Sequence, residues 1–125
     1  MYEIKDCLAT HAVGIDELPL KMKLGDKYWV PIDVRGLADD GSNPLIAYAW
    51  HTFMVYQNLY DKENVVICCT AGESRSNAIA VAVLMTYFGM EYYDAVELVR
   101  EKVPICQIDP SHLAAIRRLF SVGPP

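Results

Sequence analysis

The chain has 125 residues, of which 53% are hydrophobic and 22% are charged, and its formal net charge at pH 7 is −5. This composition excludes a disordered chain, and the length predicts a single domain over residues 1–125 with a core of its own. The acidic balance argues against nucleic acid or an anionic membrane as a general partner, because no broad basic surface is available to neutralise phosphates. Any site for anions must therefore be local.

The first residues and the cysteines indicate the cellular compartment of the protein. Residues 1–6, Met-Tyr-Glu-Ile-Lys-Asp, lack the pattern of a signal peptide, and no apolar run reaches membrane-spanning length. Four cysteines could form disulfides, but the adjacent Cys68 and Cys69 are a poor staple. We therefore expect the reducing environment of the cytoplasm. We also expect a monomer.

Local signals are weak before residue 25. Residues 2–4 are consistent with the start of a strand, and residues 15–20 with a short helix that Pro19 interrupts or begins. The segment 27–34 is rich in β-forming residues and predicts a strand, in which Pro31 indicates an edge or an end.

A polar loop and a helix are expected next. Residues 35–43 are mostly polar and contain two glycines. Asn43-Pro44 places a capping residue before a proline, which is a common start of a helix. Mostly apolar residues recur at three- and four-residue spacing from Ile46 to Gln57, and the helix should end near Tyr60-Asp61.

The central part of the chain predicts a strand followed by two helices. Residues 65–68, Val-Val-Ile-Cys, are typical of a buried strand, and the stretch 77–88 predicts a helix that Gly89 ends. This helix is apolar nearly all round, so it should lie buried at the centre of the domain. Another helix is expected over residues 91–102, with Pro104 marking its end.

A last helix is expected near the C-terminus. Asp109-Pro110 repeats the pattern of a cap followed by proline, and the buried stripe would comprise Leu113, Ile116, Leu119 and Phe120. The tail over residues 123–125 should be frayed. Early strands, with helices mainly later and around a central strand, predict an α/β fold with a small central sheet flanked by helices.

One loop joins the predicted central strand to the predicted central helix, and its sequence is Cys69-Thr70-Ala71-Gly72-Glu73-Ser74-Arg75-Ser76. A helix that starts there directs its unpaired N–H groups and its positive dipole end into the loop, which makes an anion site. A cysteine at the rim of such a site has its thiolate favoured, and the planar fork of an arginine matches two oxygens of a phosphate. The loop thus combines a nucleophile with an anion clamp.

The spacing Cys-x5-Arg followed by Ser, in this strand-loop-helix context, resembles the cysteine-dependent protein tyrosine phosphatase superfamily. Gly72 and Ser74-Arg75-Ser76 are most similar to its dual-specificity branch. The resemblance implies a compact dual-specificity phosphatase-like fold in which Cys69 attacks phosphorus and Ser76 donates a hydrogen bond to the thiolate. It also implies that the equatorial oxygens are held by the Arg75 guanidinium and by the loop residues Thr70, Ala71, Gly72, Glu73 and Ser74.

The resemblance covers roughly Tyr28 to Phe120 and leaves the first 27 residues unmatched. Residues 39–44 are similar to the acid loop of the regenerating-liver branch, and residues 89–96 to the segment that follows the central helix. The family usually carries more chain before its acid loop, so this domain is expected to be shortened at its N-terminal side.

A general acid is expected in the loop before Pro44, because the leaving alcohol or phenol needs a proton and the attacking water later needs a base. Asp40 lies 29 positions before Cys69 and directly precedes Gly41, where the resembling families place their acid, so we favour it over Asp39. Two adjacent carboxylates near a bound anion are expected to raise each other's pKa. Asp33 is a weaker third choice, and the alternative for all of them is a solvated aspartate.

Two residues depart from the family pattern. The family normally has histidine where Cys68 stands, and that histidine helps to fix the loop and to activate the nucleophile. We expect Cys68 to be a buried strand residue. Glu73 places a negative charge in an anion-binding loop, which should weaken highly charged substrates unless the side chain points to solvent.

The resulting prediction is a protein phosphatase that hydrolyses phosphotyrosine in proteins, and possible further substrates are phosphoserine and phosphothreonine. His11, His51 and His112 match no ligand spacing, so no metal and no cofactor are expected. The alternatives are a phosphate-binding module that has lost turnover, a phosphatase for RNA 5′-ends or phosphoinositides, and a redox protein that uses Cys68 and Cys69.

Overall fold

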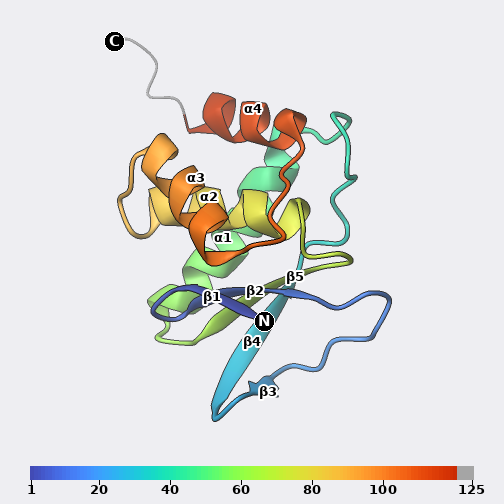
Figure 1. The fold of residues 1–125 in the computed structure, drawn as a ribbon, viewed down its shortest axis with the longest axis vertical. Helices are drawn as coiled ribbons and strands as arrows, with labels where there is room; N and C mark the ends of the chain where they lie inside the picture. The colour runs from blue at the N-terminus through green and yellow to red at the C-terminus, as the bar shows by residue number, and fades with distance from the viewer. Residues whose placement is uncertain (121–125) are drawn as a thin grey trace.

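The structure, a computed structural model, describes residues 1–120. The tail over residues 123–125, for which fraying is predicted, lies outside this range. Within it the chain forms one five-stranded mixed sheet in the order β1-β2-β5-β4-β3, in which β2 and β4 run parallel to β5 and the outer strands are antiparallel to their neighbours (Figure 1). The strands are β1 (Tyr2–Lys5), β2 (Leu8–Ala12), β3 (Met22–Leu24), β4 (Lys27–Asp33) and β5 (Val65–Cys69).

Strand β5 lies at the centre because all of its side chains can be buried. Alternate residues of a strand face opposite sides of a sheet. Val65, Ile67 and Cys69 therefore join the core beneath the helices, whereas Val66 and Cys68 join a second, smaller core on the other face. A central strand that is buried on both faces reads as a continuous apolar run, as predicted for residues 65–68.

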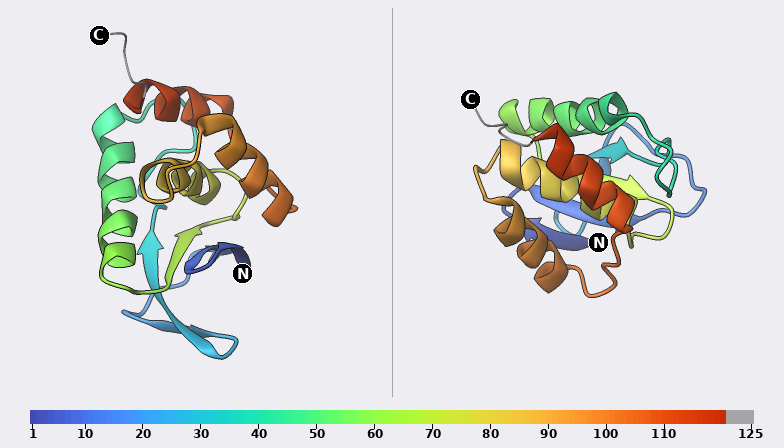
Figure 2. Two further views of the ribbon diagram at one scale, coloured as in Figure 1. Left: turned by 90° about the vertical axis from the view of Figure 1, so that its left-hand side faces the viewer. Right: turned by 90° about the horizontal axis from the view of Figure 1, so that it is seen from above.

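Four helices lie within the described residues, and Figures 1 and 2 show them gathered on one side of the sheet with α2 in their middle. Helix α2 packs against the three other helices as well as against β2 and β5. Its residues from Ala78 to Leu84 are fully buried, which confirms the predicted central helix. The helices are α1 (Leu45–Tyr60), α2 (Arg75–Thr86), α3 (Tyr92–Lys102) and α4 (Pro110–Leu119).

The opposite face of the sheet is covered by irregular chain. Trp29 is fully buried there, and Leu18 packs against the same cluster from the segment between β2 and β3. The helix predicted over residues 15–20 is wrong, because this segment is irregular. Ile15 and Leu20 are 94% and 93% exposed, so the segment lacks the apolar stripe that would stabilise a helix against the sheet.

Pro31 shows how local pairing decides where proline fits. Strand β4 as a whole is not an edge strand, since it lies between β5 and β3. However, β3 pairs only with Lys27–Trp29, so the backbone at Pro31 pairs on one side, with β5. A proline without an N–H is tolerated at such a position.

Helix ends follow the predictions with one exception. Asp109 caps α4 by accepting a hydrogen bond from the Ser111 N–H, as predicted. Gly89 has φ +71° and lets the Met90 N–H reach back to the Leu84 carbonyl at 3.0 Å, beyond the end of α2. Asn43 does not cap α1, because the helix begins one residue later than predicted, with Pro44 at the N-cap position and no side-chain hydrogen bond.

No helix within residues 1–120 is both long and apolar enough to cross a membrane.

Candidate active site

The segment from Cys69 to Ser76 runs from the last residue of β5 to the first turn of α2, as the sequence predicts, and is called the Cys69 loop. Cys69 is only 2% exposed, and its Sγ lies 3.2 Å from the Ser76 Oγ. Ser76 stands in the first turn of α2, so the sulfur sits beside a helix N-terminus and beside a hydroxyl that accepts from the thiol and can donate to the thiolate. Both groups favour a negative charge at this position.

The shape of the loop requires glycine at position 72. Gly72 has φ +73°, a conformation that other residues adopt at a cost. A Cβ there would also lie 3.1 Å from the Ala12 Cβ, closer than most packed carbon atoms. The Gly14 N–H donates to the Thr70 carbonyl at 3.0 Å, so the loop is held tightly against the chain that follows β2.

Asn77 organises the loop and has no role in the predicted site. Its side chain is fully buried, and its Nδ2 donates to the carbonyls of Gly72 and Glu73 at 3.0 and 2.9 Å. The Glu73 carbonyl also accepts from the Gln107 N–H at 2.8 Å. With these carbonyls occupied by protein donors, the N–H groups of the loop are the backbone groups available to an anion.

Arg75 braces the loop against the segment that follows β4. Its Nη1 donates to the carbonyls of Arg35 and Leu37 at 3.0 and 2.9 Å, and its Nη2 donates to the Thr70 Oγ1 at 3.1 Å. These acceptors are two carbonyls and a hydroxyl, so the guanidinium charge is not neutralised by them. The arginine thus joins the cysteine loop to the base of the predicted acid loop.

The remaining loop residues divide between surface and interior. The side chains of Thr70, Ala71 and Glu73 lie at the surface, so the Glu73 carboxylate reaches solvent. Ser74 is buried, and its Oγ accepts from the Asp109 N–H at 2.9 Å. This bond ties the loop to the start of α4.

The two acid candidates have different partners. The Asp40 Oδ1 accepts from the N–H of Ser42 at 2.8 Å and from its hydroxyl at 2.5 Å, and these hydrogen bonds lower the pKa of Asp40. The expectation that adjacent carboxylates raise each other's pKa is wrong for Asp40: the Ser42 hydrogen bonds lower its pKa and outweigh burial and the charge of Asp109, which act in the opposite direction. Asp39 instead accepts from the Nε2 of His112 at 3.0 Å.

Asp33, the third candidate for the general acid, forms an ion pair with Arg35. Its Oδ1 lies 2.9 Å from the Arg35 Nε, and this hydrogen bond lowers the pKa of the carboxyl. Asp33 therefore anchors the Arg35 side chain rather than joining Asp39 and Asp40.

His112 is the main residue that the sequence did not place in the site. It is fully buried in α4, and its Nδ1 lies 2.6 Å from the Tyr48 hydroxyl of α1. The available signal was its position: His112 precedes Ile116 by four residues and so lies on the apolar stripe of the helix. A polar side chain on such a stripe needs a buried partner.

Cys68 faces away from Cys69, into the core that contains Trp29. Burial raises the pKa of the Cys68 thiol to about 12. All four cysteines are free, and the prediction of a buried strand residue is confirmed. Adjacent thiols on opposite faces of one strand are poorly placed to form a disulfide.

Within residues 1–120 no three His, Cys, Asp or Glu side chains are grouped as they would be to hold a metal ion.

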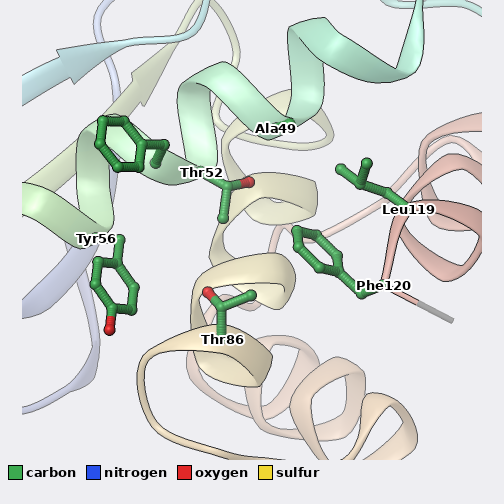
Figure 3. A pocket seen from close by; sticks show the side chains of 7 residues that line it. Ala49, Thr52, Tyr56, Thr86, Leu119 and Phe120 are labelled. Carbon is green, nitrogen blue, oxygen red and sulfur yellow. The ribbon is translucent and has the colours of Figure 1, made fainter. Parts of the chain in front are cut away.

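An apolar cavity of about 270 Å³ lies between α1, α2 and α4, and Figure 3 shows the side chains of Thr52, Tyr56 and Phe120 around it. It is lined by Thr86 at the C-terminal end of α2, whereas the Cys69 loop is at the N-terminal end. Twelve helical residues separate these ends by about 18 Å. The cavity is therefore distinct from the candidate active site.

Comparison with known proteins agrees with this geometry. Residues 29–121 match the family model described as the dual specificity phosphatase catalytic domain. The chain belongs to this family. The match begins within one residue of the predicted limit at Tyr28, so the early strands β1, β2 and β3 lie outside the matched region.

Relatives of this dual specificity phosphatase domain support the assignment. This chain is 30% identical over 105 residues to dual specificity protein phosphatase 13B of Mus musculus. The match covers 78% of this chain and 52% of the relative. The chain thus spans about half the length of that curated relative.

Solved structures show the same fold. The human tyrosine phosphatase-like serine/threonine/tyrosine-interacting protein matches with a TM-score of 0.61 and 24% identity, over 68% of this chain and 57% of that one. Human DUSP28 matches with a TM-score of 0.61 and 19% identity, over 66% and 57%. A mouse putative dual specificity phosphatase complexed with zinc tungstate has a TM-score of 0.61 and 22% identity, over 66% and 52%.

Proposed function

We propose that this domain is a protein phosphatase that hydrolyses phosphotyrosine, with phosphoserine and phosphothreonine as further substrate classes, through a cysteinyl-phosphate on Cys69. The observation that carries the proposal is the position of the Cys69 sulfur, 3.2 Å from the Ser76 hydroxyl at the N-terminus of α2. Arg75 in the same loop supplies the permanent positive charge that a phosphate dianion requires.

The first chemical step transfers the phosphoryl group to sulfur. The Cys69 thiolate attacks phosphorus, the S–P bond forms, and the P–O bond to the leaving group breaks. Loop N–H groups and the Arg75 guanidinium hold the three equatorial oxygens, where negative charge is spread in the transition state. Asp40, once protonated, gives its proton to the departing oxygen.

The second step returns the enzyme to its starting state. Water attacks phosphorus, the Asp40 carboxylate takes a proton from that water, and the S–P bond breaks. The electron pair returns to sulfur, and the Ser76 hydroxyl stabilises the thiolate that leaves. Inorganic phosphate is the product, and no redox change occurs.

Phosphoproteins are the proposed partners, and we propose that the domain acts on them as a monomer in the cytoplasm. The net charge of −5 disfavours RNA 5′-ends and phosphoinositides, because both carry several negative charges.

A phosphate-binding module without turnover is the second candidate. Two observations favour it: Cys68 replaces the family histidine, and the Ser42 hydrogen bonds lower the pKa of Asp40, which holds that carboxyl in its unprotonated form. An acid that is deprotonated at neutral pH cannot assist the leaving group until a bound phosphate dianion raises its pKa.

Hydrolysis of a small aryl phosphate against pH, in EDTA with a thiol reductant, separates the two candidates. We expect turnover by the wild type and by Cys68→Ala, none by Cys69→Ser, and loss of the basic limb of the pH profile in Asp40→Asn. Tight phosphate binding without turnover in the wild type would instead establish the binding module.

A further inference from the structure

A buried histidine links the predicted acid loop to two helices. His112 is fully buried, yet both of its ring nitrogens have partners: Nε2 lies 3.0 Å from the Asp39 Oδ1, and Nδ1 lies 2.6 Å from the Tyr48 hydroxyl. The three side chains come from the loop before α1, from α1 and from α4, and the two steps proposed above use none of them.

The hydrogen bonds in this link run in one direction. A carboxylate can only accept, so the His112 Nε2 donates to Asp39. In the neutral ring Nδ1 then accepts from the Tyr48 hydroxyl, whose oxygen accepts in turn from the Asn43 Nδ2 at 3.2 Å. Each polar atom between Asn43 and Asp39 is therefore satisfied, as a buried network requires.

Asn43 also closes the loop on itself. Its Nδ2 donates to the Ala38 carbonyl at 2.6 Å, and its Oδ1 accepts from the Ala38 N–H at 2.8 Å. The two ends of the segment 38–43 are thus held together, while Asp39 between them is held by α4. These contacts together fix one position of the loop relative to the helices.

Asp39 and Asp40 differ in how freely each could give up its hydrogen bond. Asp39 is bonded to a ring that is 0% exposed, so releasing its carboxylate would leave a buried donor unpaired. Among residues 1–120, Asp40 is hydrogen-bonded only to Ser42, an exposed residue of the same loop. Asp40 can therefore exchange this partner for the oxygen of a leaving group without disturbing the core.

We propose that His112 is the positioning residue of the acid loop: it holds Asp39 and so presents Asp40, the adjacent carboxylate, as the general acid. The inference rests on the phosphatase function proposed above. Asp39 is then a structural anion and not the acid.

A series of leaving groups tests this role, because an acid matters most when the leaving oxygen is strongly basic. The kcat/KM of His112→Gln should fall about tenfold for phenyl phosphate but less than about twofold for an aryl phosphate whose phenol is strongly acidic. Asp40→Asn should show the same selectivity with a loss of about 100-fold. Asp39→Asn should behave like His112→Gln, and the double variant should lose no more than either single variant.

The matched control is His51→Gln, which removes a histidine of α1 outside this link and should leave the whole series unchanged. Equal losses for all leaving groups in His112→Gln, or no loss at all, would overturn the positioning role. A loss of kcat/KM that is larger for basic leaving groups in Asp39→Asn, but equal for all leaving groups in Asp40→Asn, would overturn the assignment of Asp40 as the acid. Tyr48→Phe breaks the link while keeping the imidazole, and it provides the second variant if His112→Gln does not fold.

A measurement without turnover keeps the inference separate from the proposed function. In ¹⁵N spectra of the histidine rings, His112 should carry its proton on Nε2, and this signal should shift clearly more in Asp39→Asn than in Asp40→Asn. An unchanged signal in Asp39→Asn would overturn the link even if the wild type proves to be an active phosphatase. A wild type without turnover would contradict the proposed function, and the spectra would still test the hydrogen bond between His112 and Asp39.

Discussion

At the scale of single residues, position 72 is the one where the loop most clearly requires glycine. Its positive φ and the nearby Ala12 Cβ both oppose a side chain. We expect Gly72→Ala to lower the free energy of unfolding by about 1–2 kcal/mol and to weaken inhibition by inorganic phosphate. Urea unfolding and inhibition assays measure the two effects.

Gly36→Ala is the matched control for this substitution. Gly36 has no positive φ, and a Cβ built there meets nothing within 4 Å. Its effect on unfolding should stay within about 0.5 kcal/mol. Similar behaviour of the two variants would show that loop curvature at Gly72 does not matter.

At the scale of elements, β5 carries both the proposed nucleophile and an inert thiol on opposite faces. Burial raises the pKa of Cys68 from its ordinary value of 9.0 to about 12 in the folded protein. Below pH 9 both the folded and the unfolded chain keep this proton, so the thiol does not affect stability there. Above pH 9 the unfolded chain ionises first, so stability must fall between pH 9 and pH 12.

Cys68→Ala tests this pH dependence. Between pH 8 and pH 10 the unfolding free energy of the wild type should fall by about 1 kcal/mol more than that of Cys68→Ala. Urea titrations at the two pH values provide the comparison. Identical changes in both proteins would mean that Cys68 ionises equally easily in the folded state.

The same elements show what a sequence can and cannot predict. The strand β5, the Cys69 loop and α2 were predictable because their signals are local: an apolar run, a fixed spacing and a continuous buried helix. Strand β2 was not, since Leu-Ala-Thr-His-Ala has no strong preference and is held by parallel pairing with β5. The link between Asp39 and His112 spans 73 positions, and no local pattern reports such a contact.

At the scale of the whole molecule, the helices cover only one face of the sheet, and the other face depends on Trp29. This side chain is fully buried, but its Nε1 has no hydrogen-bond partner among the described residues. Trp29→Ala should cost about 3–5 kcal/mol, a large part of the stability of a small domain. Trp29→Phe should cost clearly less, because it keeps most of the packing and removes the unpaired donor.

Urea unfolding followed by far-UV circular dichroism gives both values. Equal losses in Trp29→Phe and Trp29→Ala would show that a smaller aromatic ring does not replace the packing of the indole, against the expectation.

The central claim is that Cys69 forms a covalent bond to phosphorus, and rapid acid quenching during turnover of an aryl phosphate, followed by mass spectrometry of the peptides, tests it most directly. One phosphoryl group should appear on the peptide that contains Cys69 in the wild type, and none on the same peptide of Cys69→Ser. Turnover that persists without this adduct, or a phosphoryl group on another residue, would contradict the proposed mechanism.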